Sequence, residues 1–153
     1  MIRNVLVLLA GSLMMMSAAD KPDFTGNWTL NVGKSSFGNM PKPQSMTLTA
    51  AKKGEVLHSV QTTEDGQGRK STEGDWFLDG KQHPVDPTAG ADRQTEMSKW
   101  DGRTLISERR SDNGRYLETI HMTLSRDGKT ATERVSVKSP NGNNTSTLIW
   151  ERK

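Results

Sequence analysis

Arg109 and Glu118 are the ionisable side chains whose types and spacing most clearly suggest a binding site. They flank the dipeptide Asn113-Gly114, and a two-residue turn there places Arg109 opposite Glu118 on an inward-facing side of two paired strands. Charges in an apolar interior are tolerated when they are paired. Two interpretations follow: Arg109 anchors an anionic head group that Glu118 orients, or the two form a partly solvated structural ion pair at the mouth of a barrel.

The three histidines are the other candidates for chemistry, because neutral imidazole is the commonest metal ligand in proteins. His58 is predicted to point inward, His121 outward, and His83 precedes a proline in a loop, so we expect no shared metal site. His58 is instead a candidate polar group lining a cavity. The chain has no cysteine and no motif typical of a nucleophile, a zinc protease or a phosphate-binding loop. We predict no catalytic residue, metal or cofactor.

A set of apolar side chains shares the predicted inward face. It either packs as a core or lines a small cavity, because barrels of about eight strands are just filled or hold one small ligand. The set comprises Trp28, Leu30, Met46, Leu48, Val56, Val60, Leu105, Ile120, Met122, Val135, Val137, Leu148 and Trp150. The candidate ligand-binding residues are Arg109, Glu118, His58, Trp28, Tyr116 and Met122.

A separate group is predicted to act as a structural latch that closes the barrel. It consists of Trp28, Arg152 and Glu133. We expect Arg152 to lie over the Trp28 ring in a cation–π contact and Glu133 to be the diagonal neighbour of Arg152 on the same face.

Short turn signals divide the chain into alternating segments. They are Asp65-Gly66, Asp79-Gly80, Asp101-Gly102, Asn113-Gly114, Asp127-Gly128 and Asn141-Gly142. Such dipeptides tolerate the positive φ angles of type I′ turns, so they predict hairpins. Two-residue turns pair Leu105 with Met122, Ile120 with Val135 and Val135 with Leu148. A three-residue loop ending at Gly54 pairs Leu48 with His58. Around Asp65-Gly66 this scheme needs a bulge or a longer loop.

The resulting fold class is all-β, an antiparallel up-and-down meander of about 8–10 strands. The predicted strands are 24–31, 44–51, 55–64, 69–78, 91–100, 103–111, 115–125, 129–138 and 144–152. Residues 34–43 are predicted to form a short turn or a loop over a barrel end, and two prolines exclude 82–92 from a central strand. Closure into a barrel protects the edges of such a meander. Residues 20–153 are predicted to form a single barrel domain.

Residues 1–19 have the pattern of a secretory signal peptide: Arg3, an apolar run, and small residues before Asp20. The run is shorter than the roughly 20 residues that span a bilayer, so we expect cleavage near Ala19-Asp20 and no stable membrane anchor. The protein would then be secreted or periplasmic. The formal net charge of the 153-residue chain is +3, with both signs interspersed, which does not suggest a nucleic-acid partner.

Gly26-Asn27-Trp28 near the start and Arg152 near the end resemble the calycin pattern, in which a basic side chain from the closing strand packs on an N-terminal Gly-x-Trp. Lys99-Trp100-Asp101-Gly102 adds a similarity to fatty-acid-binding proteins. The resemblance implies a lipocalin-like barrel, with Arg109 at the position of an inward arginine that contacts a ligand carboxylate. The family's helical lid is replaced here by a short Gly/Pro segment, and its C-terminal Arg-x-Tyr by Leu148-Ile149-Trp150.

We therefore expect a monomeric barrel that binds a small hydrophobic or amphipathic ligand, anionic amphiphiles included, and catalyses no reaction. One alternative is an extracytoplasmic interaction or inhibitor-type barrel with a packed interior that acts through loops 33–44 and 81–93. Another is an enzyme that uses the barrel mouth.

Overall fold

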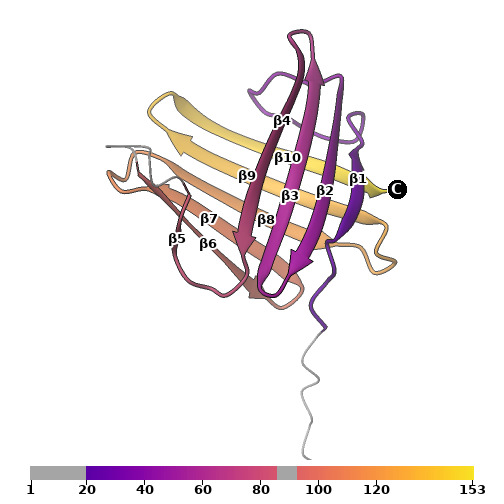
Figure 1. The fold of residues 1–153 in the computed structure, drawn as a ribbon. Helices are drawn as coiled ribbons and strands as arrows, with labels where there is room; N and C mark the ends of the chain where they lie inside the picture. Colours follow the sequence, from indigo (N-terminus) through magenta and orange to yellow (C-terminus); the bar gives the residue numbers. More distant parts are fainter. Residues whose placement is uncertain (1–19, 86–92) are drawn as a thin grey trace, which may run out of the picture.

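The computed structural model describes residues 20–85 and 93–153, which form one antiparallel sheet of ten strands and no helix (Figure 1). The predicted signal peptide and most of loop 81–93 lie outside the described residues. The strands are β1 (Gly26–Leu30), β2 (Ser45–Lys53), β3 (Val56–Asp65), β4 (Gly68–Phe77), β5 (His83–Pro84), β6 (Gln94–Asp101), β7 (Thr104–Ser111), β8 (Leu117–Leu124), β9 (Thr130–Ser139) and β10 (Gly142–Arg152).

The sheet curls into a nearly closed barrel. Its order is β4-β3-β2-β1-β10-β9-β8-β7-β6-β5, so the first long hairpins join the last strands through β1 (Figure 1). β4 and β5 are the two edges of this sheet, and among the described residues no ladder joins them. The amide of Gly80 donates to the carbonyl of Ser98 at 3.1 Å, which ties the β4–β5 connection to β6 near this gap.

The closing latch lies where β1 pairs with β10. The Arg152 guanidinium lies 4.3 Å from the centre of the Trp28 ring, which confirms the predicted cation–π contact. The same guanidinium donates to the carbonyls of Asp23, Thr25 and Gly128 at 2.7–2.8 Å. Arg152 therefore ties the N-terminal segment and the β8–β9 turn to the last strand.

Two hairpins have the predicted register. Leu105 lies opposite Met122, and Ile120 lies opposite Val135. The loops themselves are longer than predicted, since the Ser111 amide donates to the Tyr116 carbonyl across residues 112–115. These longer loops leave the same residues opposite one another, so the inward face is unchanged.

The β9–β10 register differs from the prediction by two residues. Pro140 and Asn141 occupy the corners of the turn and Ser139 pairs with Gly142, so Glu133, not Val135, lies opposite Leu148. Proline suits the first corner of a type I or type II turn because its φ is fixed near −65°. A type I′ turn needs a positive φ at this corner and therefore excludes proline. All positive φ angles among the described residues belong to glycines, so the prediction of type I′ turns was wrong.

The β2–β3 register differs by three residues, which reverses the faces of β3. Gly54 has a φ of +60° and occupies the first corner of a two-residue turn, so Lys53 pairs with Val56. Ala51, not Leu48, lies opposite His58. Leu57 is consequently the buried residue, and the inward assignments of Val56, His58 and Val60 were wrong. With this correction β3 and β4 pair without interruption from 56 to 77, so the additional bulge or longer loop is unnecessary.

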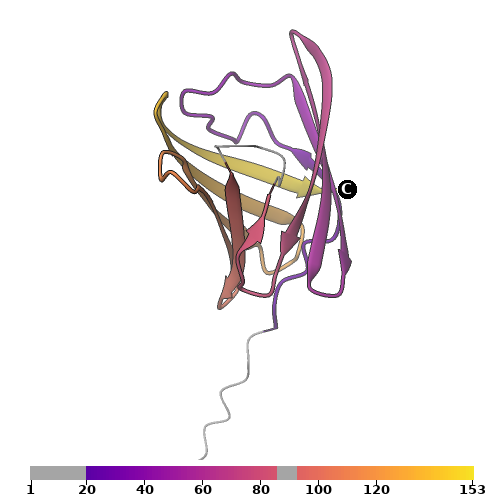
Figure 2. The ribbon, with the colours of Figure 1, turned by 60° about the vertical axis from the view of Figure 1, so that its left-hand side comes forward.

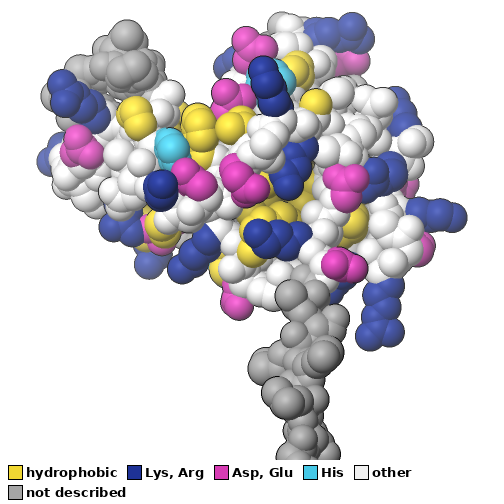
Figure 3. All heavy atoms as spheres, turned by 60° about the horizontal axis from the view of Figure 1, so that its bottom comes forward, with side chains coloured by type: hydrophobic (Ala, Val, Ile, Leu, Met, Phe, Trp, Pro, Cys, Tyr) yellow, Lys and Arg dark blue, Asp and Glu magenta, His cyan; other side chains and the backbone are white. Residues whose placement is uncertain are grey.

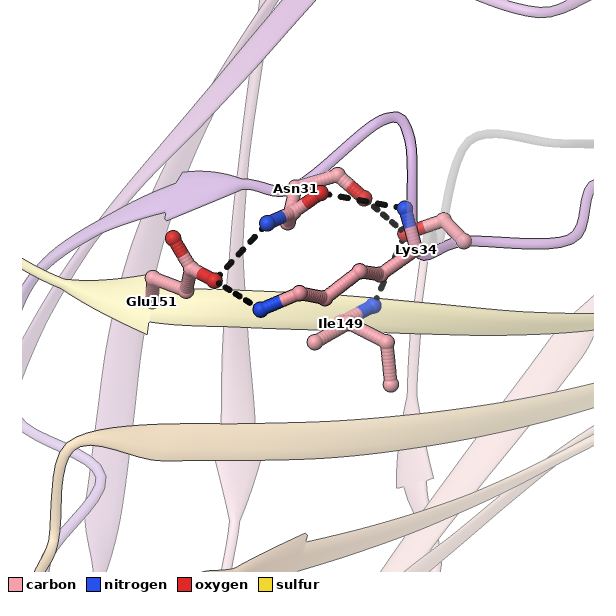
Figure 4. Close-up of polar contacts among 5 residues, drawn as sticks. Asn31, Lys34, Ile149 and Glu151 are labelled. Atoms are coloured by element: carbon pink, nitrogen blue, oxygen red, sulfur yellow. Dashed lines mark hydrogen bonds and ion pairs between the residues drawn. The ribbon is translucent and has the colours of Figure 1, made fainter.

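Residues 31–44 form a loop over one end of the barrel, as predicted (Figure 2). Asn31 and Lys34 donate their side-chain N–H groups to Oε1 of Glu151 at 2.8 and 3.2 Å, and Ser35 Oγ accepts from the Ile149 amide (Figure 4). Farther along, the Asn39 amide donates to Oδ1 of Asn144 at 2.6 Å. These bonds hold the loop against β10.

Candidate ligand-binding cavity

The interior of the barrel contains a cavity of about 390 Å³. Apolar side chains from both halves of the sheet form most of its wall, and Met40 reaches it from the loop over the barrel end. The apolar lining comprises Phe24, Trp28, Leu48, Ala50, Leu57, Trp76, Ile120, Met122, Ala131, Val135, Val137 and Trp150. This volume lies within the range of about 300–1,000 Å³ that is usual for small-molecule sites.

Polar side chains line two sides of the cavity. Ser59, Gln61 and Thr72 come from β3 and β4. The charged lining residues are Glu73 on β4, Arg109 on β7, Glu118 on β8 and Glu133 on β9. Neighbouring strands therefore bring Arg109, Glu118 and Glu133 to one wall, as their alternation along the strands requires.

Arg109 is paired with Glu96, a residue that sequence reasoning missed. Arg109 donates from Nε and Nη2 to Glu96 Oε2 at 3.2 and 2.7 Å, and Glu96 lies directly opposite it on β6. Glu118 also lies opposite Arg109, on β8, as predicted, but it is not the partner in this ion pair. Burial disfavours the charged guanidinium, yet its bonds to Glu96 and the nearby charge of Glu118 raise the pKa of Arg109 above its ordinary value.

Glu118 is bound by Tyr116, which directly precedes β8. The Tyr116 hydroxyl donates to Glu118 Oε2 at 3.0 Å. Burial and the adjacent carboxylate raise the pKa of Tyr116 to about 12, so this hydroxyl keeps its proton. Tyr116 was expected to contact a ligand, but it is not among the residues that line the cavity. Instead it positions Glu118, which does line the cavity.

Glu133 lies deep in the cavity wall and contacts a different residue from the one expected. Its Oε2 accepts a hydrogen bond of 2.7 Å from Nε1 of Trp150. Burial raises its pKa from the ordinary value of 4.5 to about 7; the Trp150 bond opposes this and the charge of Glu118 adds to it. Its assignment to the latch with Arg152 was therefore wrong in its partner. Glu133 is a cavity-lining acid.

The remaining candidates divide between the cavity and the outer surface. Trp28 and Met122 line the cavity, as expected. His58 is exposed on the opposite face of β3, where its Nδ1 lies 2.6 Å from Asp75 Oδ1. Within residues 20–85 and 93–153 no group of three or more His, Cys, Asp or Glu side chains could hold a metal ion.

A groove lies beside the cavity, at the gap between β4 and the β5–β6 pair. Its volume is about 470 Å³, and Phe77 and His83 stack across it with ring centres 4.0 Å apart. Figure 3 shows the surface hollowed between two raised parts, with hydrophobic side chains at the base. Glu73, Gly74 and Arg109 line both the groove and the cavity, so the Arg109–Glu96 pair lies between the interior and the surface.

Comparisons with known proteins identify the fold. No protein-family model matches the chain, and no curated protein is significantly similar to it in sequence. In structure it is similar to fatty-acid-binding protein 1 of Echinococcus granulosus, with a TM-score of 0.60 and 14% identity over 84% of this chain and 96% of that one.

Two further solved structures show the same similarity. A secretory abundant heat soluble protein of Ramazzottius varieornatus gives a TM-score of 0.60 and 10% identity over 90% of this chain and all of that one. The zebrafish ileal bile-acid-binding protein, solved with cholic acid, gives 0.55 and 12% over 85% and 98%. The chain therefore has the calycin-like β-barrel fold that its two ends predicted.

Proposed function

We propose that this protein is a monomeric, secreted or periplasmic barrel that binds one small apolar or amphipathic molecule in its interior and catalyses no reaction. The cavity of about 390 Å³ is the observation that supports this most strongly. Its wall is largely apolar and carries a few polar groups, the composition typical of small-molecule sites. Trp28, Ile120 and Met122 would contact the apolar part of the ligand.

The structural neighbours support the same class of ligand. The titles of two of them name fatty acid and bile acid as what those proteins bind. The proposed location depends on the leader pattern of residues 1–19. Among the described residues no helix is long and apolar enough to cross a membrane.

The structure gives less support to an interaction protein that acts through loop 33–44. That hypothesis requires a filled interior, whereas the barrel contains a cavity. It also requires a loop available to a partner, but this loop is bonded to β10 through Ser35 and Asn39.

Native mass spectrometry of the protein purified from its own host tests the proposal. We expect a population heavier than the mature chain by the mass of one small molecule, which organic solvent should extract. The apo mass alone, together with no saturable binding of the neutral apolar dye Nile red by the folded protein, would contradict the proposal.

A further inference from the structure

The balance of charges in the cavity indicates the kind of polar group that a ligand carries. Arg109 is the one cationic side chain among the described residues lining it, and Glu118 and Glu133 lie on the same wall. Arg109 could neutralise an incoming anion only if its own charge were available. Its contacts therefore determine whether anions or cations are favoured.

The positive charge of Arg109 is already paired with the carboxylate of Glu96. Two of its nitrogens donate to one oxygen of Glu96, whose side chain is only 9% exposed. The other oxygen of Glu96, Oε1, is buried and has no hydrogen-bond partner among the described residues. A ligand carboxylate that took Arg109 from Glu96 would leave this buried carboxylate without its cation, which is strongly unfavourable.

The remaining carboxyl groups favour the opposite charge. Tyr116 donates a hydrogen bond to Glu118, which helps to position that acid without neutralising it. Glu133 accepts from Trp150 and can hold a proton near neutral pH, so it can donate a hydrogen bond when neutral and pair with a cation when ionised. Arg109, the one cation in the described lining, is bonded to Glu96 and also lies opposite Glu118, so the acids around it leave this wall with an excess of negative charge.

We infer that the cavity takes amphiphiles whose polar end is a protonated amine, attracted by the negative charge of Glu118 and Glu133 on one wall, and that it discriminates against carboxylates. This inference rests on the proposed function, because it specifies the ligand of the same cavity. It differs from the anionic ligand that Arg109 suggested in the sequence, since the structure pairs Arg109 with Glu96.

A panel of ligands with one chain and three polar ends tests the inference on the full mature protein at pH 7 and low salt. The probes are dodecylamine, 1-dodecanol and dodecanoic acid, each below its micelle-forming concentration, with displacement of bound Nile red as the readout. We expect dodecylamine to bind at least about tenfold more tightly than dodecanoate, a difference of about 1.4 kcal/mol. Equal or tighter binding of dodecanoate would overturn the inference.

Isosteric variants identify the groups responsible. Glu118→Gln and Glu133→Gln should each weaken dodecylamine binding about fivefold or more relative to dodecanol binding, whereas Glu96→Gln should strengthen dodecanoate binding. Glu55→Gln, in an exposed turn, is the matched control and should change none of these affinities. Unchanged amine affinity in both cavity variants would overturn the assignment to Glu118 and Glu133.

The panel also separates this inference from the proposed function. If Nile red and dodecanol bind but the amine is not preferred, the inference is wrong and the binding barrel stands. If neither Nile red nor any of the three probes binds to the folded protein, both are wrong.

Discussion

The buried acid Glu133 should make the stability of the protein depend on pH in a predictable direction. Its pKa is 4.5 ordinarily and about 7 in the fold, so between these values the folded chain holds a proton that the unfolded chain has released. Stability must therefore fall as the pH rises through this interval. At about 1.4 kcal/mol for each pH unit, the loss between pH 4.5 and 7 amounts to about 3 kcal/mol.

The substitution Glu133→Gln removes this dependence and keeps the hydrogen bond, because the amide oxygen can still accept from Trp150. We expect the variant to match the wild type near pH 4.5 and to be more stable by about 2–3 kcal/mol at pH 8. Urea unfolding followed by tryptophan fluorescence across pH 4.5–8 measures both free energies of unfolding. Taking the difference between the two proteins cancels the titration of other groups. Parallel stability curves, or a variant that is less stable at pH 8, would refute the burial argument.

Three further perturbations test other parts of the structure. Arg109→Met should cost about 2–4 kcal/mol of stability because it leaves Glu96 buried without its cation. Adding Glu96→Met should recover most of this loss. Additive losses of the two substitutions in urea unfolding would show that the residues are not a pair. Gly38→Ala should cost at least about 2 kcal/mol, because φ is +59° and a Cβ would collide with Oδ1 of Asn144. Gly66→Ala, with no atom within 4 Å of its Cβ, should cost less than about 1 kcal/mol, and equal shifts of the two variants in thermal melts would contradict this. N-terminal sequencing of the exported protein should begin within about two residues of Asp20, and an intact first methionine in the membrane fraction would contradict the leader.

The sequence predicted the class of fold because alternation and turn signals agree along most of the chain. The two hairpins joining β7, β8 and β9 had the right partners even though their loops are longer than expected. In the first loop the Ser111 hydroxyl donates to Oδ1 of Asn113 and accepts a hydrogen bond from the Tyr116 amide. In the second loop the Ser125 hydroxyl donates to Oδ1 of Asp127 and accepts a hydrogen bond from the Thr130 amide. This repeated Ser-x-Asx-Gly arrangement keeps the pairing that a shorter turn would give.

The registers failed where a glycine or proline fits more than one position of a turn. Gly54 was placed at the end of a three-residue loop, but it occupies the first corner of a shorter one. Pro140 can occupy only certain corners, and this shifts the pairing of the last hairpin by two residues. A register shift by an odd number of residues moves side chains to the other face of the strand, whereas an even shift does not. The three-residue error at Gly54 therefore put His58 on the wrong face, and the two-residue error at Pro140 left the inward residues of β10 unchanged.

The candidate site was predicted in part for a related reason. The turn at Asn113-Gly114 relates Arg109 to the strand that follows it and brings Glu118 opposite, whereas Glu96 lies on the strand that precedes it. Gly102 and Arg103 form the corners of the β6–β7 turn, which brings Glu96 opposite Arg109. The depth of Glu133 could not be read from alternation, because alternation gives the face of a residue and not its distance from solvent.

Binding of Nile red to a cavity-filling variant shows whether the interior of the barrel is the ligand-binding site. Ile120 lines the cavity, whereas its neighbour His121 is exposed on the other face of β8, so Ile120→Trp and His121→Trp add similar bulk to opposite sides of one strand. With circular dichroism confirming that both variants fold, we expect saturable binding by the wild type and His121→Trp and a loss of affinity of about tenfold or more in Ile120→Trp. Equal binding by all three proteins would show that the dye occupies another site, and no binding by any of them would contradict the claim that the interior is a ligand-binding cavity.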